Sequence, residues 1–533
     1  MSYTCALSLK KIKDYLAGAA VVGFDFETSP IEEYRSEERA ALDAHKAAIT
    51  GVSLSVSEDS GIYIPLRHRA GRNIQRPEAV MDYLRQAVFE NATVIKVAHN
   101  LAFESMFLYA LGVIVQPPCY DTIAAAQLTL KSSTTFRGLS DSGLKTLVPQ
   151  LFHVELPDFE TVTAGRFFDE LDPQDKETVR YACADSDYAL RLYHLFNGWF
   201  DQYLPRHRRI VEQIESPTSV YCGLMRYNGL LMDRAAMEAK QAEAEERISA
   251  IREEIAFLIG DVEIGANAST SAFKSYLYKD LGLPVVKTTA KYQEAADDET
   301  MILLAAWCRE NRPELTRLFE LVQEYRRWGK IKGTYLDGYL RHINSATGRI
   351  HPDLMPLGTE TGRFAARNPN LQNMPRKGSD PIGIRNMLVA PEGYQVMELD
   401  YSQIELRVGA FYCRDARMLE TYRGGGDIHA QTTSVIYNIQ RQRGSASFPL
   451  RADQPVQRHD PENARLAVRR CVCRRGADRH ERQPWRISAA SGRLQGRKNR
   501  HDNYKVGFPF CPQYCDNASH HPGASAHGGG RFL

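Results

Sequence analysis

Acidic side chains recur in short motifs in the first part of the chain. The segment GFDFETSP places Asp25 and Glu27 two residues apart within an apolar run, so a strand would direct both carboxylates to one face. The segment AHNLAFESMF places Glu104 four residues after Asn100, where a helical pattern follows the strand-like ATVIKVA. Each motif alone is typical of a solvated surface, so neither identifies a site by itself.

A third motif, YACADSDYALRLY, places Tyr181 and Asp185 four residues apart, on one face of an expected helix. Carboxylates are hard oxygen ligands for Mg²⁺ or Mn²⁺. Two such ions can stabilise both the attacking and the leaving oxygen at phosphorus. The three motifs together therefore favour a phosphodiester hydrolase that uses two metal ions. The neighbouring Asp121 and Asp187 are assigned to exposed or capping positions.

A further acidic motif lies near residue 400, in VMELDYSQIELR. An expected strand would place Val396, Glu398 and Asp400 on one face, with Asp400 at its end. A carboxylate at the end of a strand, followed by the start of an amphipathic helix, is typical of a catalytic residue, and its oxygens could ligate a divalent ion. Glu398 is interpreted as a neighbour of this site rather than as a ligand.

The elements that must position these residues fall into regions of different pattern. Residues 1–205 alternate strand-like and helix-like stretches, which predicts an α/β domain. Residues 206–340 are helical, including a long helix capped by Asp233. Strand and loop signals return over 341–440. Residues 441–533 have few aliphatic residues and no sustained periodicity, which predicts disorder.

Charge is distributed unevenly between these regions. The 533 residues carry a formal net charge of +2, yet residues 441–533 hold 16 Arg and 2 Lys against 5 Asp and 2 Glu. This tail is therefore either a basic nucleic-acid-binding segment or a sequence foreign to the preceding fold. No stretch is long and apolar enough for a membrane span, so no membrane partner is expected. The ten scattered cysteines suit a reducing cytoplasm.

The order and spacing of the three N-terminal motifs resemble the DEDD proofreading exonucleases, in the variant with a tyrosine four residues before the last aspartate. This resemblance implies a ribonuclease H-like 3′–5′ exonuclease domain. It implies that Asp25, Glu27 and Asp185 ligate metal and that Tyr181 orients the attacking water. Glu104 stands where the family has aspartate, and its longer side chain could reach a metal directly or through water.

The segments MPLGTETGRFAARNPNLQNMP, IRNMLVAPEGYQVMELDYSQIELRVGAFY and GGGDIHAQTTSVIY resemble the family A DNA polymerases. The likeness runs from about residue 20 to 437 and includes thumb-like segments such as ESPTSVYCGLMRYNGLLMD. It implies a helical thumb and part of a polymerase palm after the exonuclease domain. It also implies two Mg²⁺ or Mn²⁺ ions per active site, with primer-template DNA, a single-stranded 3′ end and dNTPs as partners.

The polymerase resemblance assigns roles to residues around both sites. Metal ligation at the polymerase site falls to Asp400 and Tyr401. Glu405 would act as a steric gate against a 2′-OH, supported by Arg407. Nucleotide contacts are implied for Ser402, Gln403, Glu405 and His429. DNA contacts are implied for Asn100, Arg363, Gln372, Asn373 and Arg407; those from the loop at 363–373 face the minor groove, whose pattern reports base-pair geometry more than sequence.

Two parts of the family A pattern are not recognisable after residue 437: the fingers helix and the strand turn with the second catalytic aspartate. Asn503 replaces the expected glutamate in RHDNYKV, the nearest similar segment. We therefore expect that the tail results from a shifted reading frame or a wrongly joined gene model, and that this chain retains exonuclease activity and DNA binding without synthesis. A basic DNA-binding tail, or a zinc site at Cys471, Cys473, Cys511 and Cys515, are the alternatives.

The overall expectation is a monomeric, cytoplasmic family A DNA polymerase with a proofreading exonuclease. The first acidic motif begins near residue 25, so no 5′-nuclease domain is expected before it, as in phage or prophage enzymes. Two other functions stay open. One is a stand-alone exonuclease of the RNase D kind, against which the thumb-like and palm-like segments argue. The other is a non-enzymatic DNA-binding remnant, which the carboxylate motifs disfavour.

Overall fold

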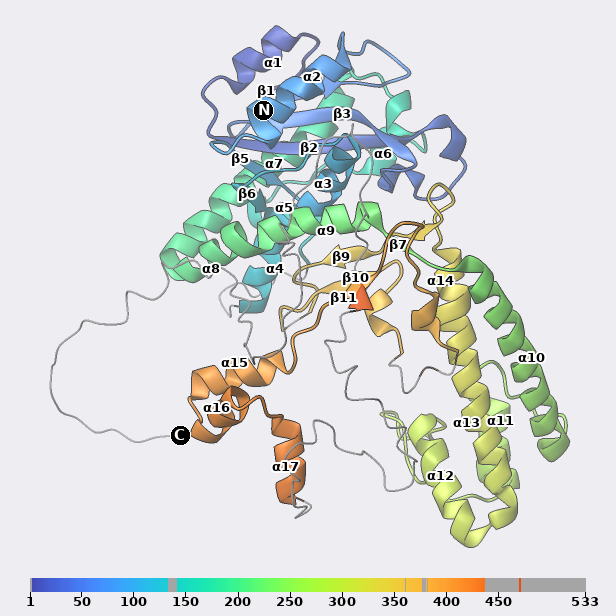
Figure 1. Ribbon diagram of the computed structural model, residues 1–533. Coiled ribbons are helices and arrows are strands. Elements are labelled where there is room, and N and C mark those ends of the chain that lie inside the picture. Colours follow the sequence, from blue (N-terminus) through green and yellow to red (C-terminus); the bar gives the residue numbers. More distant parts are fainter. Residues whose placement is uncertain are drawn as a thin grey trace. The chain divides into compact units, whose positions relative to one another are not determined.

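The computed structural model describes residues 2–132, 141–359, 361–375, 380, 382–436 and 469–470 (Figure 1). A six-stranded mixed sheet organises the N-terminal domain, in the order β1-β4-β3-β2-β5-β6. Its strands are β1 (Ser2–Cys5), β2 (Val21–Pro30), β3 (Ala47–Ser55), β4 (Ser60–Pro65), β5 (Ile95–Ala98) and β6 (Cys119–Asp121). The β2–β3 and β3–β4 pairs are antiparallel, whereas β2–β5, β5–β6 and β1–β4 are parallel. The predicted α/β class is thus confirmed.

Helices cover both faces of this sheet because its strands are apolar on both sides. They are α1 (Leu9–Leu16), α2 (Pro77–Leu84), α3 (Leu101–Ala110), α4 (Thr122–Ser132), α5 (Leu144–Phe152), α6 (Phe159–Thr163) and α7 (Lys176–Tyr203). Phe24 and Phe26 of β2 pack into one core with Phe89, with ring centroids 5.2 to 6.0 Å apart. On the other face Leu190 and Leu192 of α7 are fully buried.

Helix α7 approaches β2 closely at Gly23. A Cβ added at Gly23 would lie 2.4 Å from the backbone oxygen of Ser186 on α7. Side chains alternate along a strand, so Gly23, Asp25 and Glu27 share the face opposite to Phe24 and Phe26. The missing side chain at Gly23 therefore sets the distance between the acids of β2 and the helix that carries Asp185.

Two further helices follow α7, namely α8 (Pro205–Ile210) and α9 (Ser216–Asn228). Val220 of α9 is buried in the same core as Phe24, and a Cβ at Gly223 of α9 would lie 2.4 Å from the backbone oxygen of Ala102 on α3. Helix α9 thus packs on the N-terminal domain, although it lies beyond residue 205. The domain boundaries remain predictions.

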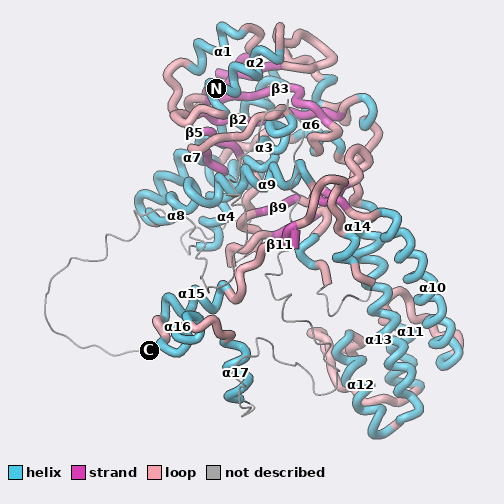
Figure 2. The backbone as a smooth tube through the Cα atoms, in the orientation of Figure 1, coloured by secondary structure: helices cyan, strands magenta, loops and turns pink. Residues whose placement is uncertain are grey.

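A helical region follows, which Figure 2 shows without strands between α10 and α14. It contains α10 (Arg234–Ile259), α11 (Ser271–Ser275), α12 (Asp298–Asn311), α13 (Thr316–Lys330) and α14 (Gly338–Arg341), joined by short 3₁₀ and π turns. As predicted, Asp233 caps α10, where its side chain accepts a hydrogen bond from the Ala236 N–H at 2.9 Å. Ile251, Ile255, Leu318 and Val322 belong to the buried core that joins α10 to α13.

Short strand pairs and three helices make up the region after α14, except that β7, the partner of β8, lies between α9 and α10. The strands are β7 (Leu230–Leu231) with β8 (Arg349–Ile350), β9 (Asp353–Met355) with β10 (Ala365–Arg367), and β11 (Met397–Glu398) with β12 (Arg469–Arg470), all antiparallel. The helices are α15 (Ile404–Cys413), α16 (Ala416–Arg423) and α17 (Ile428–Ile436).

The predicted strand through Asp400 is wrong in length. Strand β11 contains two residues and ends at Glu398. Leu399 is 77% exposed, so no packing holds the backbone extended as far as Asp400. Apart from Arg469–Arg470, which form β12, the tail lies outside the described residues, and with it the RHDNYKV segment, the zinc site and most of the stretch predicted to be disordered.

Candidate active site

The first two acids lie on the inner face of β2. Glu27 is 7% exposed and Asp25 is half-buried. A register shift in the β2–β3 pairing follows Glu27 immediately. A bulge of this kind bends a strand and re-aims the side chains beside it. The D-x-E spacing therefore places both carboxylates on one face before the strand changes direction, as the sequence predicts.

The third acid, Glu104, lies in the first turn of α3 and is 2% exposed. Its Oε2 atom has no hydrogen-bond partner within the described part of the chain. The helix starts after Asn100, which adopts a left-handed conformation with φ of 84°. The Asn100 N–H donates to Asp121 Oδ1 at 3.2 Å. A buried carboxylate oxygen without a donor is costly, so Glu104 is suited to receive a cation.

Helix α7 supplies the remaining two residues. Tyr181 and Asp185 lie one turn apart, as predicted, and the Tyr181 ring packs against Phe168 with centroids 5.7 Å apart. A second ring, Phe159, lies 6.1 Å from Tyr181. The Asp185 side chain is 16% exposed. The phenol is therefore held in position by aromatic contacts while Asp185 remains open to one side.

Electrostatics show that the four acids form one cluster. Burial raises the pKa of Asp25 well above its usual range, and the charge of Asp185 raises it further. Burial and then the charge of Asp25 raise the pKa of Glu27 and of Glu104 in the same way. Burial also raises the pKa of Asp185. Burial and then the charges of Glu27 and Asp185 raise the pKa of Tyr181, so this phenol stays protonated at neutral pH. Carboxylates that disfavour each other's charge favour a shared cation.

A lysine absent from the sequence predictions also belongs to this cluster. Lys145 Nζ lies 2.7 Å from Asp185 Oδ1 and 4.8 Å from the centroid of the Tyr181 ring. Its charge lowers the pKa of Asp25, Glu27 and Asp185 against the effects that raise them. Lys145 occupies the first turn of α5, where the helix dipole disfavours a cation. No sequence spacing links Lys145 to Asp185, 40 residues away, so the fold alone brings the two side chains together.

The donors suit a hard divalent metal ion in chemistry. Four carboxylates and the unpartnered Glu104 oxygen are the ligand types that Mg²⁺ and Mn²⁺ prefer. As the side chains stand, no three acidic, histidine or cysteine groups among the described residues converge closely enough to hold an ion. The ammonium of Lys145 takes one oxygen of Asp185 instead. The four acids therefore lie near one another without forming a complete metal-binding site.

The raised carboxylate pKa values predict a pH effect on the metal-free protein. An acid whose pKa is higher in the folded state than in the unfolded state stabilises the fold at low pH. This contribution is lost as the pH rises from about 4, the ordinary carboxylate pKa, through the raised pKa of the folded state. Glu104→Gln removes one such charge. Between pH 5 and 8 in the presence of a chelator, we expect the free energy of unfolding of the variant, relative to that of the wild type, to increase as the pH rises.

Denaturant unfolding at several pH values measures this difference. Asp14→Asn is the matched control, because Asp14 is 64% exposed and paired with Lys10 at the surface. A constant difference between Glu104→Gln and the wild type across this range would contradict the assignment of Glu104 to the charged cluster.

The prediction that Asp121 and Asp187 are exposed or capping residues is confirmed for Asp121 and wrong for Asp187. Asp121 is buried and its Oδ1 accepts from the N–H of Ile123 at 3.0 Å, so it caps α4 as expected. Asp187 was expected to be exposed or capping, and this is wrong, because it is fully buried. Its carboxylate accepts from the Tyr3 hydroxyl at 2.6 Å and from Arg191 at 3.0 and 3.1 Å. Asp187 therefore joins α7 to β1 rather than facing solvent.

The residues predicted for a polymerase site are exposed in the described structure. Asp400 lies in a loop, and Tyr401 is 72% exposed. Arg363 NH2 forms an ion pair with Glu405 Oε1 at 2.7 Å. This pair brings together two of the predicted residues, whose segments are far apart in sequence.

Local contacts order the start of α15. Gln403 has a φ of 54° and its Oε1 accepts from the Tyr422 hydroxyl at 3.1 Å. Arg407 Nε donates to the Ser402 carbonyl at 2.8 Å, and its guanidinium lies 4.5 Å from the Tyr422 ring centroid. The other predicted contact residues, all exposed, are Gln372, Asn373 and His429. No described contact joins these last three to Asp400, so their shared role stays a prediction.

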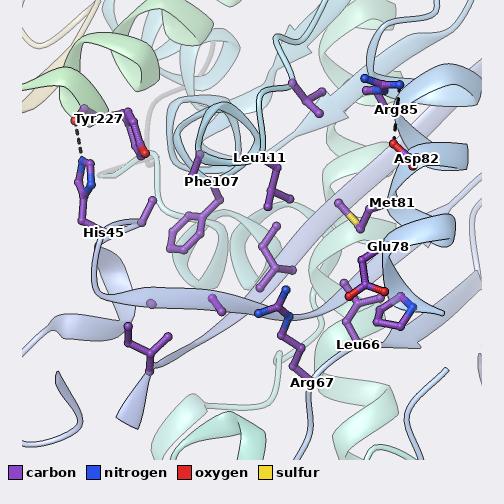
Figure 3. Close-up of a pocket in the computed structure, with 18 residues that line it drawn as sticks. His45, Leu66, Arg67, Glu78, Met81, Asp82, Arg85, Phe107, Leu111 and Tyr227 are labelled. Atoms are coloured by element: carbon purple, nitrogen blue, oxygen red, sulfur yellow. Dashed lines mark hydrogen bonds and ion pairs between the residues drawn. The ribbon is translucent and has the colours of Figure 1, made fainter. Parts of the chain in front are cut away.

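A cavity of about 580 Å³ lies elsewhere on the N-terminal domain (Figure 3). Its walls include Leu66 and Phe107, and Figure 3 shows His45 beside Tyr227, whose carbonyl oxygen lies 2.8 Å from His45 Nε2. None of the acids of the cluster lines this cavity. The cavity and the acidic cluster are therefore distinct features.

The α/β sheet, with its acids drawn from β2, α3 and α7, defines a carboxylate-lined domain of the nuclease class. Comparison with known families is consistent with this. Residues 2–198 match the 3′–5′ exonuclease family and residues 234–447 match DNA polymerase family A. The chain belongs to the family A DNA polymerases that carry a 3′–5′ exonuclease domain. Domains of these two families generally depend on divalent metal ions.

Curated relatives agree along most of the chain. DNA polymerase I of Pseudomonas aeruginosa is 29% identical over 439 residues, covering 81% of this chain and 44% of its own length. DNA polymerase I of Treponema pallidum is 27% identical, covering 82% and 44%. The thermostable DNA polymerase I of Thermus thermophilus is 33% identical over 232 residues, covering 43% and 27%. The chain thus spans less than half the length of these relatives.

A solved structure shares the fold. The POL domain of Pol1 from M. smegmatis, in complex with DNA primer-template and dNTP, aligns with a TM-score of 0.65 at 22% identity. The alignment covers 82% of this chain and 67% of that chain. Among the described residues, no helix is long and apolar enough to cross a membrane.

Proposed function

We propose that the N-terminal domain is a metal-dependent 3′–5′ exonuclease that removes nucleotides from a single-stranded DNA 3′ end. The observation that carries this proposal is the cluster of Asp25, Glu27, Glu104 and Asp185 beside Tyr181, in which burial, together with the charges of Asp25 and Asp185, raises the pKa of Glu27, Glu104 and Tyr181. The match of residues 2–198 to the 3′–5′ exonuclease family supports it.

Hydrolysis adds a water hydroxyl to the terminal phosphorus and breaks the bond to the 3′ oxygen, which leaves with the water proton. Tyr181 is held between Phe159 and Phe168, so its protonated hydroxyl can donate to or orient the water. Asp25, Glu27, Glu104 and Asp185 would hold the divalent ions, which supply Lewis-acid stabilisation of the oxygens at phosphorus. Mg²⁺ or Mn²⁺, as two ions, is the proposed cofactor.

The region after residue 205 is proposed to bind primer-template DNA. The match of residues 234–447 to family A supports this, with Arg363, Gln372 and Asn373 facing the duplex. Asp400 and Tyr401 would bind the metal ions of the polymerase site. Ser402, Gln403, Glu405 and His429 would contact the dNTP, and Asn100 and Arg407 would make further DNA contacts.

Template-directed synthesis by this chain is a separate proposal, which primer extension with dNTPs tests. Monomeric state and cytoplasmic location are proposed on the sequence evidence alone.

The test uses the purified chain and single-stranded DNA labelled at its 5′ end. We expect stepwise shortening from the 3′ end in Mg²⁺ or Mn²⁺, with release of nucleoside monophosphates. Excess EDTA should abolish shortening, and re-added metal should restore it. DNA blocked at its 3′ end is the matched substrate control. Degradation that continues in EDTA, or that starts at the 5′ end, would refute the proposal.

A further inference from the structure

The fold of the N-terminal domain places the ammonium group of Lys145 beside the acids of the cluster. Lys145 is the second residue of α5, two residues after the N-cap residue Gly143. Its Nζ is 2.7 Å from Asp185 Oδ1 and 4.8 Å from the Tyr181 ring centroid. The ammonium therefore contacts both α7 residues that the proposed function requires.

The position of Lys145 has a local cost that its surroundings must offset. A cation in the first turn of a helix opposes the helix dipole. Its side chain is 41% exposed, whereas Asp185 is 16% exposed. Lys145 is thus the more solvent-exposed partner of this ion pair. Rotation of its flexible stem moves the charge outward without moving α5.

If Asp185 Oδ1 bound Lys145 and a divalent ion at the same time, the two cations would lie side by side. Two like charges about 4 Å apart repel by about 1 kcal/mol even in a water-like medium, and by more when partly buried. The described acids do not converge on an ion while this ion pair is formed. Release of Asp185 by Lys145 would free Oδ1 of Asp185 for a divalent ion.

We propose that Lys145 is an exchangeable cation of this site. In the metal-free protein it neutralises Asp185, and when divalent ions bind it gives up that oxygen and binds a non-bridging oxygen of the scissile phosphate of the DNA 3′ end. This inference rests on the proposed exonuclease function. Lys145 remains an ammonium throughout and forms no covalent bond. Its contribution is positive charge beside the phosphate as negative charge builds up there.

The proposal predicts opposite effects on metal binding and on turnover. Lys145→Met removes the charge and keeps the length of the side chain. Without the competing ammonium, Mn²⁺ should bind at least about fivefold more tightly, the factor that corresponds to the weakest repulsion above. The kcat for single-stranded DNA should fall by about 100-fold, as for loss of one preorganised charged donor. Lys145→Arg keeps the charge and should recover most of both changes.

Mn²⁺ affinity is measured without DNA, from the electron paramagnetic resonance signal of free Mn²⁺, and kcat and KM are measured separately. Lys10→Met is the matched control, because Lys10 pairs with Asp14 at 2.8 Å on the surface, outside the cluster. It should leave Mn²⁺ affinity and kcat unchanged. Mn²⁺ affinity that is equal or weaker in Lys145→Met, or a wild-type kcat in that variant, would overturn the inference.

The two proposals fail in different ways. If the wild-type chain degrades DNA and Lys145→Met matches it in both measurements, the exonuclease function stands and the role of Lys145 is wrong. If the wild-type chain degrades no DNA, the proposed function fails, and with it the contact between Lys145 and phosphate. Tighter Mn²⁺ binding by Lys145→Met would then still support the exchange at Asp185.

Discussion

Replacement of Asp25 by alanine is expected to reduce 3′–5′ degradation of single-stranded DNA by at least about 10³-fold, the scale of losing one member of a catalytic group that acts as a unit. The charge of Asp25 acts on several members of the cluster, because it raises the pKa of Glu27, Glu104 and Tyr181. Without it the remaining carboxylates cannot hold the same ions. Single-turnover rates on 5′-labelled DNA in Mg²⁺ measure the loss.

The same variant should be more stable than the wild type when metal is absent. Asp25→Ala removes a buried charge that repels its neighbours, so thermal unfolding in EDTA should shift upward while activity disappears. Asp14→Ala, a surface substitution on α1, should change neither quantity. Undiminished degradation by Asp25→Ala would show that the site has been assigned to the wrong residues.

A methyl group at Gly23 is expected to disturb both the fold and the site. In Gly23→Ala the new Cβ would meet the Ser186 carbonyl oxygen at 2.4 Å and Leu190 Cβ at 3.1 Å, and the first of these is rigid helix backbone. Overpacking of this kind costs about 1–3 kcal/mol. Relief of the clash moves α7 away from β2, and a displacement of about 1 Å at a catalytic group can cost about 100-fold in rate.

Denaturant unfolding and single-turnover degradation measure the two effects of Gly23→Ala. Gly198→Ala is the matched control, since Gly198 lies in α7, the helix that Gly23 approaches, and an added Cβ there meets nothing within 4 Å. That control should be neutral or more stable by up to about 1 kcal/mol, because alanine has the higher helix propensity. Equal behaviour of the two variants would show that the contact at Gly23 does not set the separation of β2 and α7.

The sequence predicted the local elements of the acidic site because their signals are local. The D-x-E run of β2, the four-residue spacing of Tyr181 and Asp185, and the helix that starts before Glu104 are all periodicities that one segment displays. The structure confirms these elements, and the pKa shifts show the acids acting on each other. The catalytic roles of these residues remain predictions.

What the sequence could not show depends on packing between distant segments. Lys145 is 40 residues from Asp185, and no spacing rule links them. The burial of Asp187 depends on Tyr3, at the other end of the domain. The strand predicted through Asp400 is wrong for the opposite reason. The local sequence pattern favours a strand, but Leu399 is exposed, so no packing holds the backbone extended there.

The acids of the site lie on elements separated by most of the length of the domain, from β2 to α7. This arrangement has a consequence for how the protein folds. Contacts between segments far apart in sequence form late, after the loop between them has been closed at an entropic cost. A chain that emerges from the ribosome therefore carries β2 and α3 with no hydrolytic centre until α7 docks. In a refolding experiment, nuclease activity should return after most of the helical signal, so the ability to cut DNA reports completion of the domain.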